Sequence, residues 1–144
     1  MQIALCQINP TVGDFAKNGN KVLSFYRRAI DSGADLVVFP ELVVTGYPPQ
    51  DLLLERSFVE KNVVTMNNIA SSVGEVPAVV GYVQPEREKL FNSAALMQNG
   101  KVVGRYDKIL LPSYDVFDEE RYFTPGKNPI PFDMSIGGDI VSLG

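Results

Sequence analysis

The alternation of apolar and polar stretches along the chain predicts strands that alternate with helices. Apolar runs between turn residues predict mostly buried strands over residues 3–8 and 36–39, and a third strand over residues 78–83. Between the first two runs, residues 15–32 carry apolar side chains at helical spacing. This β-α-β opening predicts parallel strands joined by a right-handed crossover.

The ends of the two predicted helices carry recognisable signals. Asp14 is placed to cap the first helix, and Gly33 is placed to end it. Ser57 and Glu60 have the spacing of a capping box and predict that the second helix begins at Ser57. The apolar stripe of this second helix steps by three and four residues: Val59, Val63, Met66, Ile69 or Ala70, and Val73.

An antiparallel hairpin follows these elements. Residues 91–98 and 101–106 flank Asn99-Gly100, the preferred pair of a two-residue type I′ turn. A hairpin inside a β-α-β chain predicts an α/β fold with a mixed sheet and packed helices. It argues against a doubly wound nucleotide-binding fold, and the sequence contains neither GxGxxG nor GxxxxGK.

The last part of the chain has weaker strand character, over residues 131–134 and 140–143, divided by Gly137-Gly138. We find no linker, internal repeat or low-complexity segment, so one domain is predicted over the 144 residues. The final apolar run lacks the turn or helix that should follow it. The domain is therefore expected to be a partial one.

Composition narrows the class of function. Hydrophobic residues make up 45% and charged residues 21%, which is typical of a soluble globular protein, and we expect a cytoplasmic one. The net charge of −4 and the scattered basic residues argue against nucleic acid or a membrane as partner. The single cysteine, Cys6, fits a reducing compartment. Histidine is absent, which removes Ser-His-Asp and Cys-His catalysis and most zinc sites.

Two ionisable residues directly follow predicted buried strands. Glu41 comes after the strand over residues 36–39, and Lys108 comes after the hairpin. A carboxylate and an ammonium that face each other at the edge of a sheet could transfer protons and stabilise an oxyanion. The alternative is an ordinary salt bridge or two solvated side chains. Cys6 lies inside an apolar strand and is interpreted as a core residue.

The loop after Lys108 is both aromatic and acidic. Tyr114, Phe117 and Glu119 lie in it, and a surface loop anchored by aromatic side chains is the simplest interpretation. The neighbouring acidic residues suggest a divalent metal at first sight. They lack the ligand spacing of a calcium loop, so a solvated acidic loop is favoured and no metal site is predicted.

Three stretches of the sequence resemble one superfamily. FPELVVTGYPPQDL around Glu41 and YDKILLPSYDVFDEERYF around Lys108 resemble the two motifs of the nitrilase, or carbon–nitrogen hydrolase, superfamily, and the opening ALCQINPTVGDFAKN resembles it too. Details within these stretches resemble the N-terminal glutaminase domain of glutamine-dependent NAD⁺ synthetases. The resemblance covers essentially the whole chain, and its motifs occur in the expected order.

The resemblance implies a role for each candidate residue. Glu41 would be the general base that takes a proton from a cysteine thiol, and Lys108 would stabilise the tetrahedral oxyanion. Tyr114 would line the glutamine pocket. Glu119 would be an additional carboxylate at the pocket that orients the lysine. The implied fold is part of an α-β-β-α sandwich, and pairing of such sandwiches makes a homo-oligomer the expected assembly.

The superfamily's cysteine nucleophile follows a later strand, a few tens of residues beyond the lysine, and Cys6 does not match its position. We therefore expect residues 1–144 to be the N-terminal portion of a single glutaminase domain that hydrolyses no glutamine alone. The resemblance further implies a synthetase domain on the same polypeptide. That domain would use ATP and Mg²⁺, with ammonia from glutamine, to amidate nicotinic acid adenine dinucleotide.

Two other interpretations stay open. One is a free-standing amidase or carbamoylase of the same superfamily, which would lack a following ATP-binding domain. The other is a non-catalytic module that keeps the fold only for assembly. The presence of both Glu41 and Lys108 counts against the non-catalytic module.

Overall fold

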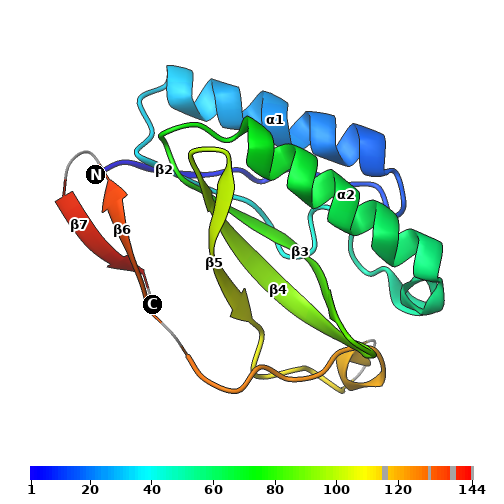
Figure 1. Cartoon of the computed structure of the whole chain (residues 1–144). Helices are drawn as coiled ribbons and strands as arrows, with labels where there is room; N and C mark the ends of the chain where they lie inside the picture. The colour runs from blue at the N-terminus through cyan, green and yellow to red at the C-terminus, as the bar shows by residue number, and fades with distance from the viewer. Residues whose placement is uncertain (115–116, 130, 137–138, 144) are drawn as a thin grey trace.

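The computed structural model describes residues 1–114, 117–129, 131–136 and 139–143. Two helices pack on one face of a five-stranded sheet, and a separate hairpin lies on its other side (Figure 1). In chain order the elements are β1 (Ile3–Leu5), α1 (Phe15–Asp31), β2 (Leu36–Val38), the 3₁₀ helix η1 (Gln50–Leu54), α2 (Arg56–Ser72), β3 (Ala78–Glu86), β4 (Lys89–Gln98), β5 (Lys101–Asp107), the 3₁₀ helix η2 (Glu119–Arg121), β6 (Phe132–Ile136) and β7 (Asp139–Leu143).

The main sheet is mixed, as the sequence predicts. Its strand order is β1-β2-β3-β4-β5, with β1, β2 and β3 parallel to one another. β4 is antiparallel to both β3 and β5. β5 therefore runs in the same direction as β2, and the carboxyl ends of these two strands lie at the same edge of the sheet.

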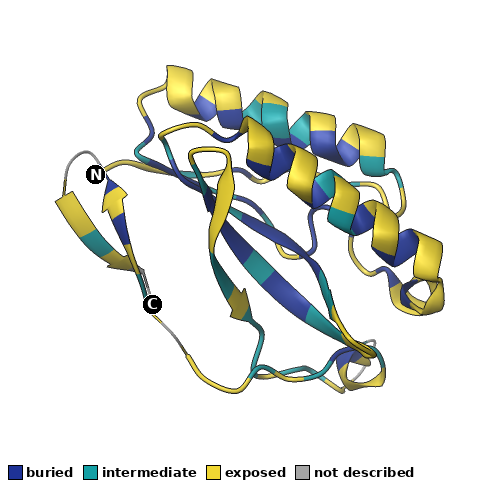
Figure 2. Ribbon diagram, viewed as in Figure 1, coloured by how far each residue is buried: buried dark blue, intermediate teal, exposed yellow. Residues whose placement is uncertain are grey.

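The principal core lies between the helices and the sheet, where buried side chains of α1 and α2 face β2, β3 and β4 (Figure 2). Tyr26 of α1 also joins the layers through its hydroxyl. This group donates to the carbonyl of Val76 at 2.6 Å and accepts from the N–H of Gly74 at 2.9 Å. Among the described residues, no helix is both long and apolar enough to span a membrane.

The predicted ends of α1 are confirmed. The Asp14 carboxylate accepts a hydrogen bond from the N–H of Lys17, as an N-cap residue does. Gly33 follows the helix with φ of +83°, the left-handed conformation that favours glycine.

The predicted capping box at α2 is wrong. The helix begins at Arg56, one residue earlier than expected, and Glu55 occupies the N-cap position without a side-chain bond. Glu60 pairs with the guanidinium of Arg56 at 2.8 Å instead of turning back to Ser57. The reason is that η1 leads directly into α2, so backbone bonds to Glu55 start the helix.

Two hairpins, not one, build the antiparallel half of the sheet. Asn99 and Gly100 adopt φ of +52° and +76°, which confirms the predicted type I′ turn between β4 and β5. A second turn joins β3 to β4, with Arg87 at φ of +56° and Glu86 paired with Lys89. No glycine or asparagine marks this turn, so the sequence pattern does not predict it. The strands on either side are longer than predicted, because they pair up to Glu86 and Lys89.

β1 is shorter and more exposed than predicted. It ends at Leu5, and Ile3 and Leu5 are 45% and 73% exposed. The strand lies at the edge of the sheet, where only one of its faces is covered by the core. Ala4 and Cys6, on that face, pack against the core.

The β6–β7 hairpin covers part of the face that the helices leave open. Met134 and Ile136 of β6 form a buried cluster with Leu36 and Leu96. Phe132 lies directly over Gly104, where an added Cβ would come within 2.7 Å of its ring. These layers form part of an α-β-β-α sandwich, as expected. The predicted break at Gly137-Gly138 lies outside the described residues.

Tyr82 provides a test of the packing of β3. Its ring is buried, its hydroxyl donates to Oε1 of Gln84 at 2.6 Å, and burial raises its pKa from 10.0 to about 12. Between pH 10 and 12 the unfolded chain releases this proton first, so the folded state loses stability as the pH rises. We expect Tyr82→Phe to lessen that fall, and to cost about 1 kcal/mol at pH 7 through the lost hydrogen bond.

Urea unfolding over this pH range measures both effects. Tyr106 on β5 is 37% exposed, so Tyr106→Phe is the matched control and should keep the alkaline fall. Equal pH dependence in the wild type and Tyr82→Phe would contradict the prediction.

Candidate active site

Three charged side chains meet at the edge of the sheet. The ammonium of Lys108, which follows β5, lies 2.8 Å from Oε1 of Glu41, which follows β2. The same ammonium lies 3.0 Å from Oε2 and 3.2 Å from Oε1 of Glu119 in η2. One cation is therefore shared between two carboxylates that come from distant parts of the chain.

The loop that carries Glu41 folds back over β3. Two strands separate β2 from β5, so the loop has to cross them for Glu41 to reach Lys108. Gly81 of β3 allows the crossing: an added Cβ would lie 2.5 Å from the backbone nitrogen of Leu42 and 2.6 Å from the carbonyl oxygen of Pro40. Only glycine permits so close an approach of two backbones.

Buried polar contacts hold this loop in place. The side-chain amide of Asn18, on α1, donates to the carbonyls of Thr11 at 2.8 Å and Val44 at 3.1 Å. Leu42, the residue after Glu41, has φ of +47° and is fully buried. Such a conformation costs free energy in a residue with a side chain, and the packing around Leu42 has to outweigh that cost.

The backbone of Lys108 is held on both sides. Its N–H donates to the carbonyl of Asn92 on β4 at 2.8 Å, and its carbonyl accepts from the N–H of Gly126 at 2.9 Å. Gly126 packs so closely that an added Cβ would overlap the carbonyl oxygen of Asp107. The Lys108 side chain thus leaves the sheet from a fixed point.

Glu119 is the buried member of the cluster. Its side chain is 7% exposed, and Oε1 accepts a long hydrogen bond from the Tyr47 hydroxyl at 3.4 Å. Oε2 makes the 3.0 Å ionic contact with Lys108 without hydrogen-bond geometry, and the described residues offer it no other donor. Glu119 therefore has an acceptor oxygen free inside the protein.

The electrostatics of the cluster decide which of its side chains can act as a base. Burial alone lowers the pKa of Lys108, but hydrogen bonds and charge from Glu41 and Glu119 outweigh it, and the pKa lies above its ordinary value. Burial first, and then the charges of Glu119 and Glu41, raise the pKa of Tyr47. At neutral pH Lys108 is a fixed cation and Tyr47 a neutral donor, so a carboxylate is the base that the cluster offers.

The structure brings three of the four sequence-predicted residues together and leaves Tyr114 further out. Tyr114 is 65% exposed and packs edge-on against Phe117, with ring centroids 5.7 Å apart. Phe117 and Glu119 both line a cavity of about 290 Å³. The role of Tyr114 in a pocket stays a prediction, and neighbouring Asp115 lies outside the described residues.

Sequence reasoning missed two contacts of the site. Tyr47 reaches Glu119, and the Asn92 side-chain amide donates to Oε1 of Glu41 at 2.5 Å. Asn92 had a signal, because it and Ser93 are a polar pair inside an otherwise apolar strand. Its partner could not be identified without the three-dimensional pairing of β4.

Cys6 is a core residue, as predicted. It is 8% exposed among apolar side chains, and burial raises the pKa of its thiol. Within the described part of the chain, no three His, Cys, Asp or Glu side chains group together to hold a metal ion.

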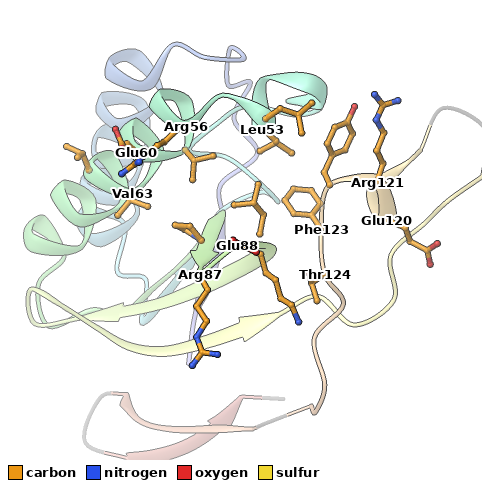
Figure 3. A pocket seen from close by; sticks show the side chains of 17 residues that line it. Leu53, Arg56, Glu60, Val63, Arg87, Glu88, Glu120, Arg121, Phe123 and Thr124 are labelled. Carbon is orange, nitrogen blue, oxygen red and sulfur yellow. Dashed lines mark hydrogen bonds and ion pairs between the residues drawn. The ribbon is translucent and has the colours of Figure 1, made fainter.

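A different, open groove of about 1280 Å³ lies beside α2 (Figure 3). Arg56 and Glu60 of α2 lie along one side, and Glu120 and Arg121 lie along the other. Its seventeen lining residues include none of the three charged residues of the cluster. The lining mixes basic, acidic and apolar side chains, and this mixture favours no single chemistry.

Comparison with known proteins places these features in context. The profile of the carbon-nitrogen hydrolase family matches residues 2–144. A glutamine-dependent NAD(+) synthetase of Thermotoga maritima is 43% identical over 129 residues, which are 88% of this chain and 22% of that protein. The chain thus spans less than a quarter of the length of this curated relative.

Two solved structures share the fold. A glutamine-dependent NAD⁺ synthetase from Acinetobacter baumannii, in complex with ADP, is 35% identical with a TM-score of 0.87, and the match covers 97% of this chain and 26% of that one. A glutamate-to-glutamine variant of an amidase from Nesterenkonia sp. is 29% identical with a TM-score of 0.80, covering 99% and 56%. Its structure records addition of acrylamide at the active site cysteine.

The close approach at Gly81 yields a first prediction for the site. Gly81→Ala forces the backbone of Pro40 to Leu42 away from β3, so we expect a loss of about 1–3 kcal/mol in the free energy of unfolding. Gly74→Ala is the control, because its added Cβ meets only the Tyr26 hydroxyl at 3.8 Å. Urea unfolding measures both variants, and an equal loss in the two would show that the crossing is not tight.

The shared cation yields a second prediction. Lys108→Met leaves the buried Glu119 carboxylate without its cation, and we expect a loss of about 1–3 kcal/mol in unfolding free energy. Adding Glu119→Gln should recover part of this loss, because the unpaired charge is removed. Urea unfolding of the four-member mutant cycle measures the coupling. Additive losses in the two single variants would contradict a coupling between Lys108 and Glu119. Arg56→Met is the control: it removes an exposed ion pair and should leave the stability unchanged.

Proposed function

The chain belongs to the carbon-nitrogen hydrolase family, and we propose that it supplies the general base and the oxyanion-stabilising cation of a domain that hydrolyses glutamine to glutamate and ammonia. The observation that carries this proposal is the single ammonium of Lys108 held between Glu41 and Glu119. A carboxylate beside a fixed cation suits amide hydrolysis through a thiol, since a base has to generate the nucleophile and a cation has to stabilise the anion formed.

In the proposed reaction, Glu41 accepts the proton of a cysteine thiol, and the resulting thiolate attacks the carbonyl carbon of the glutamine side chain. The tetrahedral oxygen then carries negative charge, which Lys108 stabilises. The carbon–nitrogen bond breaks, Glu41 returns the proton to the leaving nitrogen, and ammonia departs. Water then attacks the thioester and releases glutamate, with Glu41 taking and returning a proton in the same way.

Glu119 and Tyr114 are the proposed substrate contacts. Oε2 of Glu119 is buried without a hydrogen-bond donor, and a carboxamide N–H of glutamine would supply one. The cavity of about 290 Å³ beside Glu119 has room for a small substrate, and Glu119 is the one member of the charged cluster among its lining residues. Phe117 also lines it, and the Phe117 ring packs against Tyr114. Glu119 would thereby fix both the ammonium of Lys108 and the amide.

The nucleophile has to come from outside residues 1–144. Cys6 is the one cysteine in the sequence, and its thiol packs in the core with a raised pKa, which disfavours the thiolate. The amidase relative has an active site cysteine, which supports a thiol mechanism for this family member. We therefore propose that the 144 residues hydrolyse no glutamine on their own.

The larger reaction proposed is that of a glutamine-dependent NAD⁺ synthetase. Its support is the 43% identity to the relative of that name, in which this chain matches 22% of the length. Ammonia would pass to a synthetase domain of the same polypeptide, and ATP and Mg²⁺ would bind to that domain. A homo-oligomer is the proposed assembly.

A free-standing amidase is the second candidate function. It is favoured by the TM-score of 0.80 with the amidase from Nesterenkonia sp., of which the match covers more than half. The two candidates differ in substrate: the first requires glutamine, and the second would accept small aliphatic amides. They also differ in whether ATP consumption accompanies amide hydrolysis.

Ammonia release tests the proposal. We expect none from the 144-residue chain, and glutamine hydrolysis from the extended polypeptide, which is the full encoded chain with its cysteine nucleophile. In that polypeptide, Glu41→Gln and Lys108→Met should each lower kcat/KM about a thousandfold, because each removes a group used in the transition state. Glu60→Gln and Lys61→Met on α2 are charge-matched controls and should keep full activity.

Three results would overturn the proposal. One is ammonia release by the purified 144-residue chain that survives Glu41→Gln. Another is full activity of Lys108→Met in the extended polypeptide. The third is hydrolysis of butyramide but not glutamine, which would support the free-standing amidase instead.

A further inference from the structure

One residue of β4 contacts both members of the proposed base–cation pair. Asn92 is 4% exposed, and its side-chain Nδ2 donates to Oε1 of Glu41 at 2.5 Å. Its main-chain carbonyl accepts the N–H of Lys108 at 2.8 Å. Asn92 therefore holds the Glu41 carboxylate through its own side chain and the backbone of Lys108 through its own main-chain carbonyl.

Both donors to the Glu41 carboxylate converge on the same oxygen. Oε1 accepts from Nδ2 of Asn92 and from Nζ of Lys108, at 2.5 and 2.8 Å. Among the described residues, no hydrogen bond reaches Oε2. The carboxylate is thus held through one oxygen, and the other keeps its lone pairs available for a proton.

We propose that Asn92 is a positioning residue for proton transfer, which holds Oε1 of Glu41 so that Oε2 is the oxygen that accepts the proton of the nucleophile. The inference rests on the proposed amide hydrolysis, and it adds a residue and an oxygen assignment to that reaction. Asn92 touches neither the substrate nor the nucleophile, and its effect is transmitted through Glu41.

The register of β4 explains why the position takes a polar residue. Asn92 pairs with Val83 on one neighbouring strand, and Ser93 pairs with Asp107 on the other. Successive side chains point to opposite faces, so Asn92 faces Glu41 while Ser93 donates to Oδ1 of Asp107 at 2.6 Å. Of the two, only the Asn92 side chain reaches the site.

A neutral donor suits the charges that surround Glu41. The Lys108 ammonium contacts it directly, Lys108 also contacts the Glu119 carboxylate, and the Tyr47 hydroxyl contacts Glu119. With Glu41 and Glu119 ionised, this cluster carries a net charge of one negative unit. An amide stabilises the Glu41 carboxylate without adding charge. An aspartate in its place would add a third carboxylate and remove the donor.

Loss of this donor should act on the base and not on substrate affinity. A hydrogen bond to a carboxylate favours its ionised form and fixes its orientation, so the Glu41 carboxylate without Asn92 loses this stabilisation and rotates more freely. The acid limb of the pH–rate profile should then move to higher pH. The expected loss in kcat is about 10- to 100-fold, the value of a hydrogen bond to a charged group, with KM within about threefold.

The kinetic test uses the extended polypeptide that carries the nucleophile, with Asn92→Ser and Asn92→Asp. Serine is too short to reach Glu41, and aspartate should lower kcat further and move the acid limb more than serine. Asn62→Ser is the matched control, since Asn62 is also fully buried and bonds only to the backbone of Val83. It should lower stability but leave the acid limb in place.

While a variant stays folded over the pH range, a lower folded fraction scales the rate without moving the acid limb, and Asn62→Ser checks that acid unfolding is not the cause of a shift. An acid limb that stays at the wild-type pH in both Asn92 variants would overturn the proposal. A shift of equal size in Asn62→Ser would overturn it as well, because the effect would then follow stability alone.

A second measurement separates this inference from the proposed function. In the ¹⁵N-labelled 144-residue chain, the Asn92 side-chain amide proton should resonate downfield and move upfield in Glu41→Gln, where the acceptor loses its charge. If the chemical shift of this amide proton does not change in Glu41→Gln, the contact is refuted even if glutamine is hydrolysed. If the chemical shift does change but the extended polypeptide has no amidase activity, the contact between Asn92 and Glu41 is supported. The catalytic role of Asn92 is then overturned together with the proposed function.

Discussion

The site depends on one ammonium shared by two carboxylates. Glu119 is buried, and an unpaired carboxylate there would cost about 1–3 kcal/mol, so Lys108 stabilises the η2 segment in addition to its proposed chemical role. Glu41, which is more exposed, completes the cluster from the far side. The same contact thus ties together three segments that are far apart in sequence.

Bringing these segments together requires unusual backbone packing. Strands of a sheet lie about 4.8 Å apart, so β2 and β5, with two strands between them, are separated by roughly 14 Å. The loop after β2 bridges this distance by lying directly on Gly81, and Gly126 presses against the backbone before Lys108. Buried Asn18 and Asn92 supply hydrogen bonds along the way. The geometry of the cluster is therefore set by main-chain contacts, which leave little room for movement.

Local signals in the sequence were enough for the elements and for the positions of Glu41 and Lys108. The Asp14 cap and the Asn-Gly turn depend on nearest neighbours, and both are confirmed. The apolar runs located the first three strands but not their ends. The turn at Arg87 was missed because no turn residue marks it, and the capping box at Ser57 failed because η1 starts α2 instead. The partner of Asn92 depends on the crossing of a distant loop, which no local pattern encodes.

The cluster also bears on what the site would release. Two carboxylates and one ammonium leave a net negative charge, and Oε2 of Glu119 still lacks a donor. An amide substrate offers N–H groups to such an oxygen, whereas an ionised carboxylate product offers only acceptors and carries a like charge. Under the proposed reaction, the arrangement that orients the amide therefore disfavours the glutamate formed from it.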